Sequence, residues 1–233
     1  MEVPLSVSTT SGPRRFRAIA GAAVLLLLVG CGAKEVVVKG NFPPPVMEPI
    51  PLSIGIWYPQ AFSTHEFFDE AKGRAESAWL VRTGEAQVQM WDQLLAGMFE
   101  RLKHMDGKPA PSQMNPAVDA VLIPSIKELQ YAIPAHTNIK VYEIWMRYGF
   151  ELVTVSGDPI AEWTMTAYGK TPTAFLQSDE AAVNLAAVVA LRDAGAHFIT
   201  SFQKVPEVSQ WLALYDEDPA AAPQAGGLGN ATD

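Results

Sequence analysis

The sequence predicts an α+β fold, in which an antiparallel or mixed sheet is covered by two main helices as a two-layer sandwich. Segments with apolar residues at every second position recur between residues 52 and 168, as expected of strands with one buried face. Two long segments, residues 85–104 and 178–202, have the apolar content and length of helices. The predicted order of elements is strand, second strand, helix, strand, long hairpin and helix. This order fits a sheet covered by two helices.

The N-terminal segment precedes this domain and has a different character. Three arginines, at positions 14, 15 and 17, come before an apolar run of thirteen residues, 18–30. At about 1.5 Å per residue the run spans roughly 20 Å as a helix, which is too short for the ~30 Å hydrocarbon core of a bilayer. A basic cluster followed by a short apolar run is typical of a secretion signal.

The four residues Leu28-Val29-Gly30-Cys31 resemble the lipobox of bacterial lipoprotein precursors. In that family the cysteine thiol receives a diacylglyceryl group, the preceding peptide bond is cut, and the new amino terminus is usually acylated. The resemblance implies a signal peptide at residues 1–30 and a lipid anchor at Cys31. Because Gly32 is not the aspartate that retains such proteins in the inner membrane, it also implies the periplasmic face of the outer membrane.

Composition limits the partners of the mature chain. The full chain has 17 basic and 25 acidic residues; without the three arginines and Glu2 of residues 1–30, 14 and 24 remain, a net charge of −10. Nucleic-acid binding needs clustered lysines and arginines, so it is excluded. Anionic lipid would weakly repel this surface, so we expect membrane attachment through the lipid anchor alone. Cys31 is the only cysteine, which excludes a disulfide or a thiol-based metal site.

Residues 31–51 are predicted to be a tether. Five prolines lie between positions 43 and 51 and favour extended polyproline II structure. Fully extended, about twenty residues at ~3.1 Å each would hold the domain up to ~60 Å from the bilayer. Residues 36–38, three valines, are the exception and could equally form a short edge strand.

The domain is predicted to span residues 52–215. Its first half has a strand at 52–58, a loop with a helical turn near 66–72, a second strand at 77–81 and an amphipathic helix at 85–104. A strand at 120–126 contains Pro124, which suggests an edge or a bulge.

The second half begins with a hairpin of strands 139–155 and 160–168, with a bulge expected at Gly149. A helix then begins after Ser178, which caps it, and a short helix follows Pro206. Residues 216–233 are acidic and then rich in Ala and Gly, and are predicted to be disordered.

No catalytic or metal-binding constellation stands out. The four histidines, His65, His104, His136 and His197, lie in separate segments, and none has the spacing of a zinc or hydrolase motif. The polar cluster of residues 65–70 is better explained as a solvated loop than as a metal site. The sequence lacks the nucleophile-elbow, phosphate-loop and dinucleotide-binding motifs. We therefore predict neither enzymatic activity nor a cofactor.

A binding surface is the remaining expectation. Trp57, Phe62 and Trp145 are candidates for the outer side of the sheet, where aromatic residues would mark a partner surface. The alternative is that these rings are covered by helices or pack under loops. The proline-flanked loops at residues 59–66 and 107–117 are further candidate contact sites.

The order of elements over residues 52–214 is similar to that of small α/β domains of outer-membrane lipoproteins, of the curli-secretion type and of the ABC-transport auxiliary type. This resemblance implies a non-enzymatic accessory factor or scaffold with an envelope protein partner. One alternative is a lipid or small-molecule carrier with a cavity between the helices and the sheet face of Tyr142, Ile144 and Met146. Another is an envelope hydrolase that uses His65 or His136.

Overall fold

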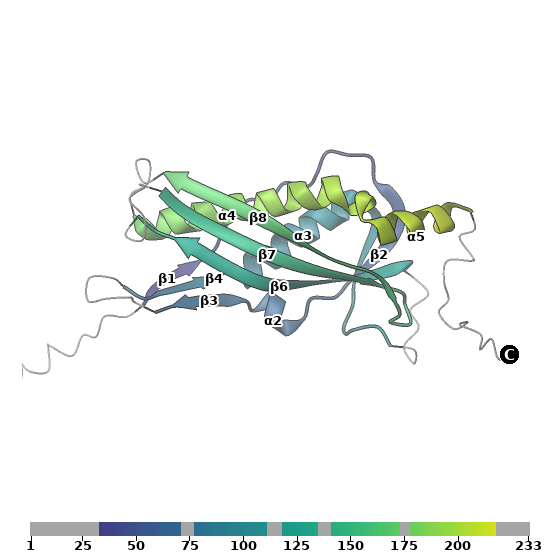
Figure 1. Ribbon diagram of the computed structural model, residues 1–233, viewed down its shortest axis with the longest axis horizontal. Coiled ribbons are helices and arrows are strands. Elements are labelled where there is room, and N and C mark those ends of the chain that lie inside the picture. Colours follow the sequence, from purple (N-terminus) through teal and green to yellow (C-terminus); the bar gives the residue numbers. More distant parts are fainter. Residues whose placement is uncertain (1–32, 71–76, 111–117, 135–140, 173–177, 218–233) are drawn as a thin grey trace, which may run out of the picture. The chain divides into compact units, whose positions relative to one another are not determined.

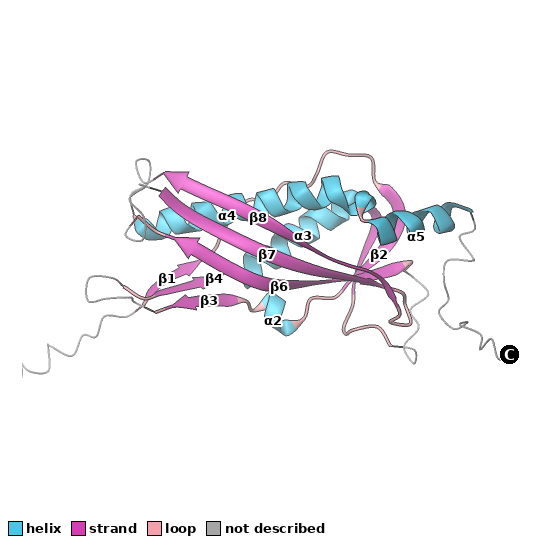
Figure 2. Ribbon diagram, viewed as in Figure 1, coloured by secondary structure: helices cyan, strands magenta, loops and turns pink. Residues whose placement is uncertain are grey.

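Two sheets and a layer of helices build the domain, which confirms the α+β class (Figures 1 and 2). The computed structural model describes residues 33–70, 77–110, 118–134, 141–172 and 178–217. The predicted signal peptide, Cys31 and the tail at 218–233 lie outside these residues. The chain from Lys34 onward belongs to one unit.

The larger sheet has the strand order β5-β2-β6-β7-β8. Strand β2 (Ile50–Ile56) runs parallel to both β5 (Phe99–His104) and β6 (Ala120–Ala132). Strands β6, β7 (Val141–Val153) and β8 (Pro159–Pro172) are antiparallel, as the sequence predicted for 139–168. Gly157, with φ of 92°, supplies the left-handed residue of the β7–β8 turn.

The bulge expected at Gly149 lies in the neighbouring strand. The register of β6 against β7 shifts between Ile126 and Glu128. A Cβ atom on Gly149 would come within 2.2 Å of Cε of Lys127, so glycine makes room for the lysine of the bulge. Pro124 lies beyond the last β6 residue that pairs with β2. The amide donor that proline lacks is therefore not needed for hydrogen bonds between β6 and β2.

The predicted helix at 85–104 is wrong in its last turn and a half. Helix α3 (Gly84–Met98) ends at Phe99, whose backbone is extended, and the chain continues directly as β5. Strand β5 pairs with β2, and this long-range pairing overrides the local helical pattern. The helical turn predicted near 66–72 is also wrong. A short α2 (Gln60–Ser63) is followed by β3 (Glu66–Asp69).

The smaller sheet includes part of the predicted tether. Strand β1 (Lys34–Val37) runs parallel to β4 (Trp79–Arg82), and β4 is antiparallel to β3. The edge-strand alternative for the valines is therefore right for Val36 and Val37. The free tether is wrong for residues 34–51, because four of their apolar side chains are buried: Val36, Val38, Phe42 and Ile50.

Residues 38–45, here called the strap, are held against α4 (Asp179–Ser201). The side-chain amide of Asn184 accepts from the Lys39 amide at 2.8 Å and donates to the Lys39 carbonyl at 3.2 Å. Arg192 donates to the Asn41 carbonyl at 2.8 Å. The strap therefore crosses the helical layer before it enters β2 (Figure 1).

Helix α4 begins at the predicted cap, where the Ser178 hydroxyl accepts from the Ala181 amide at 3.2 Å. It is long and apolar enough to cross a membrane, but 56% of its most apolar window is buried inside the domain, as in a core helix. It approaches β8 so closely that a Cβ atom on Gly169 would lie 2.0 Å from the Ala186 carbonyl oxygen. Its small residues make this approach possible: Ala182, Ala186, Ala187, Ala190 and Ala194.

Aromatic rings fill the space between the helices and the larger sheet. Trp91 of α3 lies with its ring centroid 5.2 Å from that of Phe150 on β7 and 5.1 Å from that of Phe198 on α4. Phe202 of the short η3 helix (Phe202–Lys204) extends the cluster. Helix α5 (Pro206–Glu217) buries Trp211 and reaches Glu217, so residues 216 and 217 are helical and not part of a disordered tail.

The substitution Gly169→Ala should destabilise the domain by about 3 kcal/mol, because the added methyl would collide with the backbone of α4. Gly107→Ala is the matched control, since a Cβ atom there meets nothing within 4 Å. Urea unfolding followed by tryptophan fluorescence measures both. Equal midpoints for the two variants would contradict the close approach of α4 and β8.

Candidate partner-binding surface

The outer face of strands β6, β7 and β8 exposes one large aromatic side chain. Alternation along β7 buries Ile144 and Met146 at 1% exposure each and points Trp145 away from the core. Trp145 is 51% exposed, the expected result for a tryptophan on the solvent side of a strand with helices only behind it. The structure thus places Trp145 on the outer side of the sheet, as the sequence analysis proposed.

Trp145 has a partner on the next strand. Tyr168 of β8 is its cross-strand neighbour, and the two ring centroids lie 4.6 Å apart. The Tyr168 hydroxyl donates to Glu143, and this hydrogen bond raises the pKa of Tyr168 to about 12. The hydrogen bond to Glu143 holds the Tyr168 ring in place beside Trp145.

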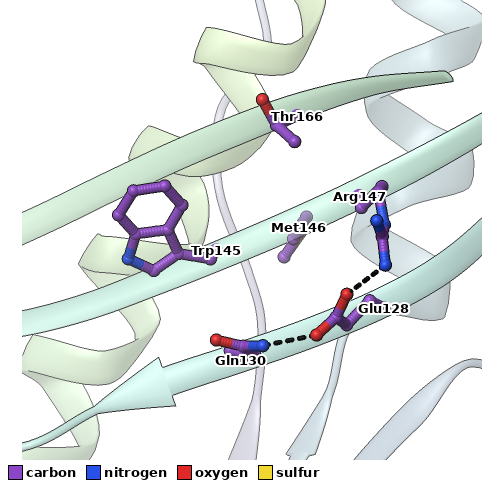
Figure 3. A pocket seen from close by; sticks show the side chains of 6 residues that line it. All are labelled: Glu128, Gln130, Trp145, Met146, Arg147 and Thr166. Carbon is purple, nitrogen blue, oxygen red and sulfur yellow. Dashed lines mark hydrogen bonds and ion pairs between the residues drawn. The ribbon is translucent and has the colours of Figure 1, made fainter.

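Polar groups border the tryptophan on its other side. Arg147 of β7 donates to Glu128 of β6, which also accepts from the Gln130 amide (Figure 3). Together with Trp145 and Thr166, these side chains line a depression of about 130 Å³. Ligand pockets usually measure about 300–1,000 Å³, so this depression suits a single protruding side chain better than a whole small molecule.

The edge of β8 beside this face is partly covered. Asp193 of α4 accepts from the Tyr168 amide at 2.9 Å, and His197 of α4 lies with Nδ1 3.2 Å from the Thr166 carbonyl oxygen. These contacts use backbone groups that an added strand would need. A partner that binds near Thr166 and Tyr168 would therefore contact the side chains of this face and would not add a strand to the sheet.

The other two predicted surface aromatics are not part of this face. Phe62 is 2% exposed and stacks on Tyr58 with ring centroids 5.6 Å apart, so its assignment to an exposed surface is wrong. Helix α2 turns the ring inward, which strand alternation did not anticipate. Trp57 is partly buried and packs against a second small apolar cluster, whose members are Val118, Val121, Ile123 and Val153.

His65, one of the two histidines of the hydrolase alternative, has a structural partner. Its Nδ1 lies 2.8 Å from Oγ1 of Thr83, which also accepts from the Gln87 amide at 2.8 Å. Burial lowers the pKa of His65, which favours the neutral imidazole. His136 lies outside the described residues.

One polar cluster could not be predicted from the sequence. Asp92 of α3 accepts from the Tyr58 hydroxyl at 2.8 Å and lies 3.3 Å from Nε2 of His104. The three residues come from different segments, so no spacing could have revealed them. Burial raises the pKa of Tyr58, which keeps its hydroxyl a proton donor and makes it a poor nucleophile. In the described part of the chain, no group of three or more His, Cys, Asp or Glu side chains could hold a metal ion.

A cavity exists, but not where the carrier alternative placed it. Tyr142, Ile144 and Met146 are at most 5% exposed and belong to the packed core. A cavity of about 530 Å³ lies instead between the strap and the helices, lined mainly by apolar residues. The lining includes Phe42, Pro44, Met90, Leu94 and Ile199.

No protein-family model and no curated protein matches the chain. Among solved structures, a Xanthomonas campestris protein of family DUF330 is 11% identical, covers 76% of this chain and 98% of its own, and has a TM-score of 0.47. A minor lipoprotein from Acinetobacter baumannii is 12% identical over 66% and 92% of the two chains, with a TM-score of 0.34. An uncharacterised lipoprotein B from Nitrosomonas europaea is 12% identical over 74% and 94%, with a TM-score of 0.37.

Burial lowers the pKa of His65, so its protonation should destabilise the fold. The folded state binds this proton less tightly than the unfolded chain, whose histidine pKa is about 6.5. The contribution of His65 to the free energy of unfolding is thus complete above the unfolded-state pKa. It decreases as the pH falls toward the lower pKa of the folded state.

His65→Asn should therefore reduce the loss of unfolding free energy between about pH 7.5 and about pH 5.5, measured by urea unfolding. His197→Asn removes a histidine from the exposed face of α4 instead and is the matched control. If both variants retain the wild-type pH dependence, His65 does not carry it.

Proposed function

We propose that this protein is a bacterial lipoprotein, anchored through Cys31, that acts as a non-enzymatic accessory factor of an envelope assembly or transport complex. The surface offered to a protein partner is the Trp145 face, defined as Glu128, Gln130, Trp145, Arg147, Thr166 and Tyr168. The exposed Trp145, supported by Tyr168, is the observation that carries the proposal. The lipobox-like Leu28-Val29-Gly30-Cys31 supports the anchor and, with Gly32, the outer membrane.

The Trp145 face has the composition of an interaction surface. Tryptophan, tyrosine and arginine are the residues that most often dominate binding energy at protein interfaces. Here one of each lies on neighbouring strands, and each is already held by a contact within the face. Little side-chain freedom remains to be lost on binding, which favours affinity.

A lipid or small-molecule carrier is the second candidate, favoured by the cavity beneath the strap. Its volume of about 530 Å³ suits a small molecule, and its lining is mostly apolar. Arg192 and Asn41 at its edge could orient a polar group. The two candidates place the ligand on different surfaces of the domain, so one experiment can separate them.

Trp145→Ser should weaken binding of the protein partner by about 2 kcal/mol, or roughly thirtyfold, because the aromatic anchor of the face is removed. Leu214→Ser is the matched control, since Leu214 is 49% exposed on α5. The measurement is mass spectrometry of the protein, cross-linked in cells and extracted in mild detergent. The yield of a partner complex is then compared with that of the wild type.

A defined partner at fixed stoichiometry, lost with Trp145→Ser and kept with Leu214→Ser, is the expected outcome. A partner retained equally by both variants would show that another surface binds it. A protein that comes alone with a bound lipid or metabolite mass would favour the carrier and its cavity.

Cys31→Ala should release the protein from membranes washed with high salt, because its acidic surface has no strong attraction for lipid. Gly32→Asp is the matched variant, since it keeps the cysteine. By the same resemblance, it should stay membrane-bound but move to the inner membrane. A Cys31→Ala protein that still sediments with washed membranes would disprove the anchor.

A further inference from the structure

We propose that the outer face of the small sheet lies on the bilayer, so that the domain rests against the membrane and is not held away from it. This face, here called the membrane face, consists of Glu35, Val37, Glu66, Phe68, Leu80 and Arg82. The inference rests on the proposed lipid anchor at Cys31 and adds where the domain sits and which surface contacts lipid.

The link between the anchor and the domain is very short. Strand β1 begins at Lys34, only three residues after Cys31. Three residues span at most about 11 Å, whereas a free tether to residue 51 would span up to ~60 Å. A lipid chain attached at Cys31 therefore brings the first residues of β1 to the headgroup region of the bilayer.

The first residue of β1 is firmly held by the domain. The Lys34 amide donates to the Ala78 carbonyl at 2.7 Å, and its ammonium group lies 2.8 Å from an oxygen of Asp179. The same ammonium group lies 4.9 Å from the centroid of the Trp79 ring. These contacts fix Lys34 within the domain, so only residues 32 and 33 separate the proposed anchor from backbone that the domain holds.

The membrane face exposes apolar side chains. Phe68 is 56% exposed and Val37 is 40% exposed, and both point away from the core by strand alternation. Leu80 lies opposite Phe68 on β4 and is partly exposed, because Trp79 and Val81 take the inner side. An exposed phenylalanine on an edge strand favours an apolar contact, and the interfacial layer of the bilayer supplies one.

The charges of this face largely cancel. Arg82 in the middle strand lies 3.0 Å from Glu35 on β1 and 3.3 Å from Glu66 on β3. The face as a whole carries one excess negative charge, and the neighbouring Lys34 is shared between Asp179 and Glu180. Such a surface is compatible with zwitterionic lipid but is not attracted to it strongly, so the contact depends on the anchor.

This orientation leaves α5 away from the bilayer. It also leaves Trp145 on the outer face of the larger sheet, since the inner face packs on the small sheet through Tyr131 against Phe67 and Trp79. The small sheet lies at one end of the domain and α5 at the other, with β6, β7 and β8 running between them (Figure 1). Three side chains with nearly equal exposed fractions lie on three different surfaces: Phe68 (56%), Trp145 (51%) and Leu214 (49%). They are matched positions for a test of orientation.

The test uses the full-length, lipidated protein reconstituted into phosphatidylcholine vesicles. Cys31 is the only cysteine and its thiol is blocked by the lipid, so Phe68→Cys, Trp145→Cys or Leu214→Cys supplies a unique site for an environment-sensitive fluorophore. Val37→Cys provides a second site on the membrane face. Lipid with a spin label near the headgroup serves as quencher, and mass spectrometry establishes that Cys31 carries its lipid.

We expect a blue shift of emission and quenching for labels at positions 68 and 37, and neither effect at 145 or 214. Quenching at 145 or 214 equal to that at 68 would overturn the orientation. Lipidated protein without quenching at 68 and 37 would overturn the membrane contact while the anchor stands. An unmodified Cys31 would overturn the anchor and this inference with it.

Discussion

The close approach of α4 to strand β8 is the constraint on which the rest of the structure depends. It is possible only because the facing residues are small, with Gly169 directly beneath Ala186 and Ala190. Because one side of α4 packs closely on β8, its other sides can make polar contacts. Asn184 and Arg192 then hold the strap, Asp193 and His197 cover part of the β8 edge, and Asp179 binds Lys34. One helix thus organises the sheet, its edge and residues 34–45.

The same arrangement separates the two surfaces to which we assign function. Helices cover one face of the larger sheet, so the opposite face can expose Trp145 without loss of core packing. Residues 34–45 do not cross that face, because the strap is bound to the helical layer and β1 is bound to β4. The proposed anchor next to β1 and an open sheet face elsewhere are compatible with the proposal that the protein binds lipid and a partner at the same time.

Much of the strand pattern was predictable because alternation is a local property. The β7–β8 hairpin, the inward set of side chains on β7 and the outward Trp145 all follow from period-two patterning around one turn. The Ser178 cap followed from local chemistry as well. One error lies where a distant segment decided the outcome, since Phe99 leaves its helix to pair with β2. The other is local: Phe62 lies on a short helix that was not predicted and turns inward to stack on Tyr58.

The sequence by itself determined the α+β class, the long hairpin and the Ser178 cap, because each depends on residues adjacent in the chain. It also supplies the lipobox-like Leu28-Val29-Gly30-Cys31, on which the proposed anchor rests. Only the tertiary structure decided that the proline-rich strap is bound to the domain, since Lys39 and its partner Asn184 are 145 positions apart. It likewise brought Trp145 next to Tyr168 and Glu128 next to Arg147, because contacts across strands depend on register, which a single sequence does not reveal.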